Sequence, residues 1–156
     1  MIAPDPALTI RRASPHEPGA AALLHQSHAL MQALYPPEQN HFLSLDALAA
    51  PGILFFLAEE GATALGTGAL ALRPGYGEVK SLFTAEAARG RGVAAALLAT
   101  LEAEARAASL PWLRLETGPG LDAAHRLYTR AGFTPCGPFG AYEESPGSLF
   151  FEKALS

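Results

Sequence analysis

The chain has 156 residues, of which 49% are hydrophobic and 17% are charged, and its formal net charge is −4. This composition is typical of a folded globular protein, and the length suits a single domain, so we expect one domain over residues 1–156. The negative charge argues against a nucleic-acid partner, because such binding relies on Lys and Arg side chains that neutralise phosphates.

The sequence also predicts where the protein is found. Its longest apolar runs, 53–58 and 93–99, are too short to span a bilayer, so no membrane partner is expected. Residues 1–6 lack a basic segment followed by an apolar one, which argues against a secretory signal. The single cysteine, Cys136, excludes an internal disulfide and fits a reducing compartment. We therefore expect a cytoplasmic protein that acts as a monomer or homodimer.

The first half of the chain is predicted to form a strand, two helices and then three consecutive strands. Helical spacing of apolar residues leads up to Tyr35, where Pro36 and Pro37 end the first helix. Turn residues separate the three strands, which favours an antiparallel meander. The other predicted bounds are strand 8–12, helix 43–49, and strands 53–59, 63–72 and 78–84.

The second half begins with a long helix over 93–108, and its apolar residues form one stripe. A buried strand, Trp112–Thr117, and a helix over 122–131 follow, and Gly132 is placed to end that helix. Two strands flank the Gly- and Pro-rich segment 137–148, and the last of them covers 149–153. The predicted order is β-α-α-β-β-β-α-β-α-β-β, a mixed α/β fold.

The segment Arg89-Gly90-Arg91-Gly92-Val93-Ala94 joins a strand to the long helix and has the features of an anion site. Two glycines permit a tight turn and close approach of backbone N–H groups to a ligand. The start of the helix adds unpaired N–H groups and the positive end of the helix dipole, which suits a phosphate. An ordinary turn with two solvated arginines is the alternative.

Two other nucleotide motifs fit this segment poorly. Ala95 stands where the third glycine of the dinucleotide fingerprint would be, although that fingerprint tolerates alanine there. The stronger objection is position, because dinucleotide units usually open a domain and this segment lies past the middle of the chain. No Gly-Lys-Ser or Gly-Lys-Thr occurs, which excludes a Walker A loop.

The spacing of Arg89, Gly92 and Ala94 fits the Q/R-x-x-G-x-G/A phosphate loop of acetyl-coenzyme A enzymes, and here the chain resembles the GNAT superfamily of N-acetyltransferases. The resemblance runs from about Leu8 to Lys153. Its downstream motifs are Leu115-Glu116-Thr117-Gly118, Ala124, Leu127-Tyr128 and Ala131-Gly132-Phe133. It implies the GNAT fold, with a central, mostly antiparallel twisted sheet.

The resemblance also implies an activity and its co-substrate. GNAT enzymes transfer an acetyl group from acetyl-CoA to an amine by direct attack in a ternary complex, here to a small molecule or peptide. Two alternatives are a CoA-binding regulatory domain without turnover and a transferase of a longer acyl group. The expected CoA-binding residues are the backbone of Leu82, Phe83 and Thr84, and the loop residues Arg89, Gly90, Arg91, Gly92, Val93 and Ala94.

Two residues are the candidate catalysts that the resemblance implies. Glu78 would be the general base, with water or another residue as the alternative, and strand alternation places residues 78, 80, 82 and 84 on one face. Tyr128 would protonate the departing thiolate, unless it only fills space. Helix spacing predicts that Tyr128 lies on the flank of its helix while Ala124, Leu127 and Ala131 face the core. One departure is Leu121, since the family usually has Asn or Gln there.

The resemblance also implies an acceptor side between the first two helices, with the loop between the last strands as a further candidate region. Its candidates are Tyr35, Asn40, His41 and Tyr142, with Phe139, Glu143 and Glu144 as weaker ones, and loop packing is the alternative. His25 and His28 have helical spacing but no third ligand nearby, so no metal is expected.

Overall fold

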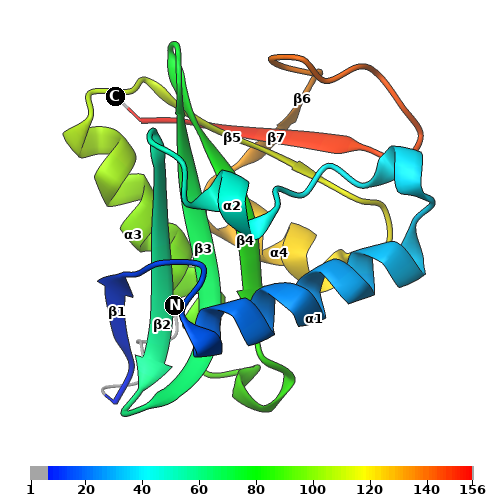
Figure 1. Ribbon diagram of the computed structural model, residues 1–156. Helices are drawn as coiled ribbons and strands as arrows, with labels where there is room; N and C mark the ends of the chain where they lie inside the picture. The colour runs from blue at the N-terminus through cyan, green and yellow to red at the C-terminus, as the bar shows by residue number, and fades with distance from the viewer. Residues whose placement is uncertain (1–6, 156) are drawn as a thin grey trace.

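The computed structural model describes residues 7–155, so residues 1–6, on which the prediction of no secretory signal rests, lie outside the described range (Figure 1). The elements follow the predicted order. They are β1 (Thr9–Arg12), α1 (Pro18–Leu34), α2 (Leu45–Leu48), β2 (Ile53–Glu60), β3 (Thr63–Arg73), β4 (Tyr76–Thr84), α3 (Val93–Ala107), β5 (Trp112–Thr117), α4 (Asp122–Arg130), β6 (Thr134–Cys136) and β7 (Leu149–Ala154). Within the described range, no helix has the length and hydropathy to cross a membrane.

One seven-stranded sheet has the order β1-β2-β3-β4-β5-β7-β6, and its neighbours are antiparallel except β4 and β5. These two parallel strands pair only at Gly77 with Leu113 and at Glu78 with Arg114. Beyond Glu78 the strands separate, and Figure 1 shows β5 and β7 turned at a wide angle to β4. The predicted fold class, a mixed and mostly antiparallel sheet, is confirmed.

The two faces of the sheet carry separate hydrophobic clusters. Helices α1 and α2 cover one face, where Leu24, Leu48 and Phe55 are fully buried (Figure 1). Helix α3 covers the other face together with α4, and the predicted apolar stripe of α3 is buried there. Close packing of α3 depends on Gly66 of β3, because a Cβ at this position would lie 2.7 Å from a Val93 methyl carbon.

A β-bulge in β4 corrects one prediction. Thr67 pairs with Phe83 but Ala69 pairs with Lys80, so Ser81 and Leu82 together stand opposite one residue of β3. Ser81 has a φ of 53°, which is rare for a residue other than glycine. The extra residue inverts the alternation. Leu82 therefore packs with the α3 side and Phe83 with the α1 side, and the prediction that 82 and 84 share the face of 78 and 80 is wrong.

Candidate functional site

The site is built around the opening between β4 and β5. Because pairing stops after Glu78, the edge of β4 that faces β5 has no strand partner over Leu82, Phe83 and Thr84. Backbone N–H and C=O groups along such an edge are available to an extended ligand. This is the segment whose main chain was predicted to hold the coenzyme arm, and the structure leaves it accessible for that role.

The glycine loop lies at the start of α3. Gly90 and Gly92 have φ values of 83° and 78°, in the left-handed region that residues with a Cβ seldom adopt. Gly92 is the N-cap of α3, and no side chain caps the helix, so its first N–H groups have no intrahelical partner. These amides together form an anion-binding end of the kind that suits phosphate.

The two arginines of the loop differ in their surroundings. Arg89 is exposed, and the structure records no hydrogen bond or ion pair of its side chain with the described residues. Arg91 forms an ion pair with Glu60, at 2.6 Å between Nη2 and Oε2. Arg89 is therefore the better placed of the two to meet a phosphate, whereas Arg91 already has a carboxylate partner.

Glu78 lies in a buried polar network. Its carboxylate accepts a hydrogen bond of 2.6 Å from the Tyr142 hydroxyl. It also forms an ion pair with Arg73, whose Nε lies 3.3 Å from Oε1. Lys80 Nζ lies 3.5 Å from the same carboxylate and donates to the Tyr142 oxygen and to the backbone oxygen of His41. Glu78 and Lys80 are only 3% and 9% exposed, so mutual pairing offsets the cost of burying their charges.

A cavity of about 710 Å³ adjoins this network. It brings together the predicted acceptor residues His41 and Tyr142 with Glu78. Aromatic rings support this region, since the Tyr142 ring packs edge-on against His41, Phe139 and Phe150. Charged side chains of Arg73, Lys80, Glu143 and Glu144 also line the cavity. The cavity has the size and mixed polarity of a small-molecule site.

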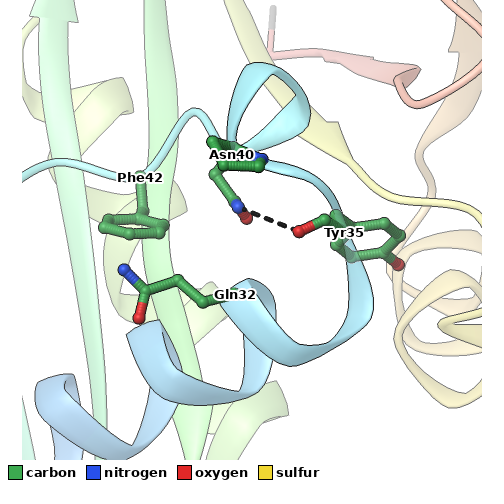
Figure 2. Close-up of a pocket in the computed structure, with 5 residues that line it drawn as sticks. Gln32, Tyr35, Asn40 and Phe42 are labelled. Carbon is green, nitrogen blue, oxygen red and sulfur yellow. Dashed lines mark hydrogen bonds between the residues drawn. The ribbon is translucent and has the colours of Figure 1, made fainter.

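The structure places the other two predicted acceptor residues apart from this cavity, at the end of α1. Figure 2 shows Tyr35 and Asn40 around a smaller cavity of about 240 Å³, together with Gln32 and Phe42. The Asn40 amide donates to the Tyr35 backbone oxygen at 3.3 Å, and thereby satisfies a carbonyl at the helix end. Phe42 lines both cavities, so the two lie side by side.

Tyr35 also connects α1 to the loop after β5. Its hydroxyl donates a 2.6 Å hydrogen bond to the Pro119 oxygen, and its ring lies directly against Gly118. A side chain at position 118 would collide with this ring. His125 of α4 contacts the same loop, with Nε2 3.0 Å from the Gly118 oxygen. These contacts fix the loop that connects β5 to α4, and thereby the position of Tyr128.

Tyr128 is 7% exposed and packs against Phe133 and Phe151, both with ring centroids 6.0 Å away. The prediction that it lies on the flank of α4 is wrong, because Tyr128 lies one turn after Ala124 and so shares its inward face. Burial raises the pKa of Tyr128 to about 12, and the charge of Glu116 contributes. The phenol therefore keeps its proton at neutral pH and can donate it.

Three residues of the site were not identified in the sequence. Arg73 and Lys80 stand five and two positions from Glu78, but only the fold shows that they surround its carboxylate. Glu116 occupies a half-buried position in the alternating strand β5. Burial raises the pKa of Glu116, although its interaction with the Ser148 hydroxyl acts in the opposite direction. The signal for Glu116 was a carboxylate between two buried residues of a core strand, Leu115 and Thr117.

The histidine pair on α1 gives no metal site. His28 stacks on Phe42, with ring centroids 4.1 Å apart, and burial lowers its pKa. Across residues 7–155, no group of three or more His, Cys, Asp or Glu side chains has the arrangement to hold a metal ion.

The fold and the site define the class of protein. The sequence model of the Acetyltransferase (GNAT) family matches residues 22–133, and the chain belongs to this family. Among its relatives is an IAA acetyltransferase from Azospirillum brasilense, 43% identical over 152 residues that cover 96% of this chain and 99% of the relative. Family and relatives together make the chain an acyltransferase.

Solved structures agree with this assignment. A Klebsiella pneumoniae protein assigned provisionally to the acyl-CoA N-acyltransferases has a TM-score of 0.80 and 32% identity, with 96% of this chain and 98% of that chain covered. The PaiA N-acetyltransferase from Thermoplasma acidophilum, solved in complex with coenzyme A, has a TM-score of 0.72 at 16% identity and covers 94% of this chain and 98% of its own. At that identity, the second likeness concerns the fold alone.

Proposed function

We propose that the protein transfers an acetyl group from acetyl-CoA to a primary amine of a small molecule or peptide, by direct attack in a ternary complex. The observation that carries this proposal is the opening that β4 and β5 leave beyond Glu78. The same fold has an uncapped, glycine-rich start of α3 and a buried tyrosine, Tyr128, on α4. Membership of the GNAT family supports the same reaction.

The residues present fit acetyl-CoA as co-substrate. The glycine loop offers backbone N–H groups with no Cβ at Gly90 and Gly92, and Arg89 offers an exposed guanidinium. The free edge of β4 over residues 82–84 offers main-chain N–H and C=O groups to the extended arm of the coenzyme. When bound, the co-substrate supplies the activated acetyl thioester. The crystallised coenzyme A complex of a protein with the same fold supports this fit.

The chain's own residues then bind, orient and move protons. His41, Tyr142 and the Glu78–Lys80 pair line the cavity on the acceptor side. Burial raises the pKa of Tyr128 to about 12, so Tyr128 is protonated at neutral pH and supplies its proton to the sulfur as the thiolate leaves. A carboxylate on the acceptor side takes a proton from the incoming amine, and Glu78 is the carboxylate that the sequence predicted for this role.

The test is release of free thiol from acetyl-CoA in the presence of single acceptors. A suitable panel contains amino acids, polyamines, drug-like amines, peptides with a free N-terminus, and IAA because one relative is named for it. The proposal expects thiol release that depends on one class of amine, with the acetylated product identified by mass spectrometry. Binding of acetyl-CoA without transfer to any amine would favour a CoA-binding regulatory domain. Better turnover with longer acyl thioesters would show that the donor carries a longer acyl group than acetyl.

A further inference from the structure

We infer that Glu116, rather than Glu78, is the residue that takes the proton from the incoming amine. This inference rests on the proposed function and names the proton acceptor of the same site. The first observation is geometric. Residues paired in a parallel ladder share a face, so Arg114 points to the same side of the sheet as its partner Glu78. Alternation along β5 then places Glu116 on that side as well, while Leu113 and Leu115 are buried on the other.

The position along the strand separates the two carboxylates. Glu78 belongs to the last residue pair that joins β4 to β5, so it lies where the strands are still in contact. Glu116 lies two residues beyond Arg114, the ladder partner of Glu78, where the strands have separated. The proposed co-substrate arm follows β4 through this opening. Glu116 therefore stands beside the reaction centre, whereas Glu78 stands behind it on the acceptor side.

The hydrogen-bond and ion-pair partners of the two carboxylates support the same assignment. Both Arg73 and the Tyr142 hydroxyl donate to the carboxylate of Glu78, with Lys80 close by. Each of its two oxygens therefore already accepts a hydrogen bond within the protein. In the described part of the chain, no ion pair of Glu116 is recorded, and the Ser148 hydroxyl is its one polar side-chain partner. A carboxylate that is half-buried and unpaired can accept a proton at little cost.

The charges around Glu116 connect the two halves of the site. Four residues on the acceptor side contribute to the pKa of Glu116. They are Ser148 of the segment before β7, His41 of the segment before α2, and Lys80 and Glu78 of β4. The charge of Glu116 in turn contributes to the raised pKa of three tyrosines: Tyr142 in the same region, Tyr35 at the C-cap of α1, and Tyr128 of α4. Glu116 is thus electrostatically linked both to the cavity residues and to the proposed acid. The amine is expected to attack between the cavity residues and Tyr128, and Glu116 is therefore suitably placed to accept its proton.

An ammonium nitrogen gives one proton to a Glu116 carboxylate oxygen, and its freed lone pair forms the C–N bond to the acetyl carbon. The C–S electron pair leaves with the sulfur, which takes the Tyr128 hydroxyl proton, and Tyr128 regains a proton from the same nitrogen. Glu116 then passes its proton to water, so that one proton is released for each acetyl group transferred.

Kinetics of three variants test this assignment with the amine that the acceptor panel identifies. We expect Glu116→Gln to lower kcat by about 10²–10⁴-fold, the usual contribution of a general base, and to remove the acid limb of the pH–rate profile. Glu78→Gln should keep that limb and mainly raise KM, because it disturbs the acceptor cavity. Glu104→Gln, on α3 away from the opening, is the matched control and should behave like the parent.

A titration without any acceptor gives the second readout. In protein labelled with carbon-13 at the glutamate carboxyls, the resonance that disappears in Glu116→Gln should titrate above the usual glutamate value of about 4.3. A normal midpoint, or a Glu116→Gln enzyme that keeps its acid limb with less than about a tenfold loss, would overturn the inference. If the parent transfers acetyl to no amine at all, the proposed function itself fails and the inference falls with it, which is a separate result.

Discussion

The Tyr142 hydroxyl donates a 2.6 Å hydrogen bond to the carboxylate of Glu78, a residue 64 positions earlier in the chain, and accepts one of 2.9 Å from Lys80. One side chain of the loop before β7 thus holds a buried ion pair of the central strand together. Burial raises the pKa of Tyr142, and the hydrogen bond to Glu78 raises it further, so the phenol stays protonated as a donor.

Removing this hydroxyl should destabilise the protein. In Tyr142→Phe the ring packing remains, but a charged, buried acceptor loses its donor, which typically costs about 1.5–3 kcal/mol of unfolding free energy. Urea unfolding monitored by circular dichroism measures the loss. Tyr76→Phe is a matched control, because the structure records no hydrogen bond of its hydroxyl with the described residues, and it should stay within about 0.5 kcal/mol of the parent. Equal stabilities for both variants would show that the hydrogen bond from Tyr142 to Glu78 does not contribute to the free energy of unfolding.

Arg89 should contribute to coenzyme affinity and little to stability. Arg89→Ala removes an exposed charge from the glycine loop, and loss of a charged contact to phosphate should cost about 1.5–3 kcal/mol of binding free energy. Isothermal titration with acetyl-CoA measures this change, while the melting temperature should barely move. Arg130→Ala, an exposed arginine of α4, serves as the control for net charge. Identical affinities for the two variants would place the phosphates elsewhere.

The raised pKa of Glu116 predicts a pH dependence of stability. Burial favours its protonated form in the folded state, so the folded chain binds more protons than the unfolded chain just above the normal glutamate pKa. Stability therefore falls as pH rises from the unfolded pKa through the raised folded pKa, and the loss is complete above it. Glu116→Gln lacks this loss, so its melting temperature relative to the parent should be higher at pH 8 than at pH 4. A pH-independent difference would contradict the raised pKa.

The sequence predicted the fold well because its signals were local. Proline and glycine punctuation located the element ends, and the apolar stripe of α3 located the core side of that helix. The face of β4 was mispredicted because strand alternation assumes an even pleat, and nothing in the segment around Ser81 indicates the extra residue of a bulge. The inward position of Tyr128 could have been derived, since Ala124 lies four residues before it.

The site was predicted only in part because much of it depends on distant contacts. The glycine loop is one continuous segment, so its residues could be read together. Lys80 and Tyr142 are 62 positions apart, and their hydrogen bond follows from the sheet order that brings the segment before β7 over β4. Glu116 is defined by the separation of β4 and β5, a tertiary feature with no signature in either strand.

Tyr128→Phe gives the most direct test of the proposed reaction, because it deletes a hydroxyl from a ring whose packing against Phe133 and Phe151 is retained. Steady-state kinetics with the identified amine should show kcat lower by about 10²–10⁴-fold, the range expected for a general acid. Binding of acetyl-CoA, titrated on the same preparation, should hardly change, since an interaction made only in the transition state does not affect ground-state affinity. A turnover less than about tenfold below that of the parent, with chemistry limiting the rate, would contradict a role for Tyr128 at the sulfur.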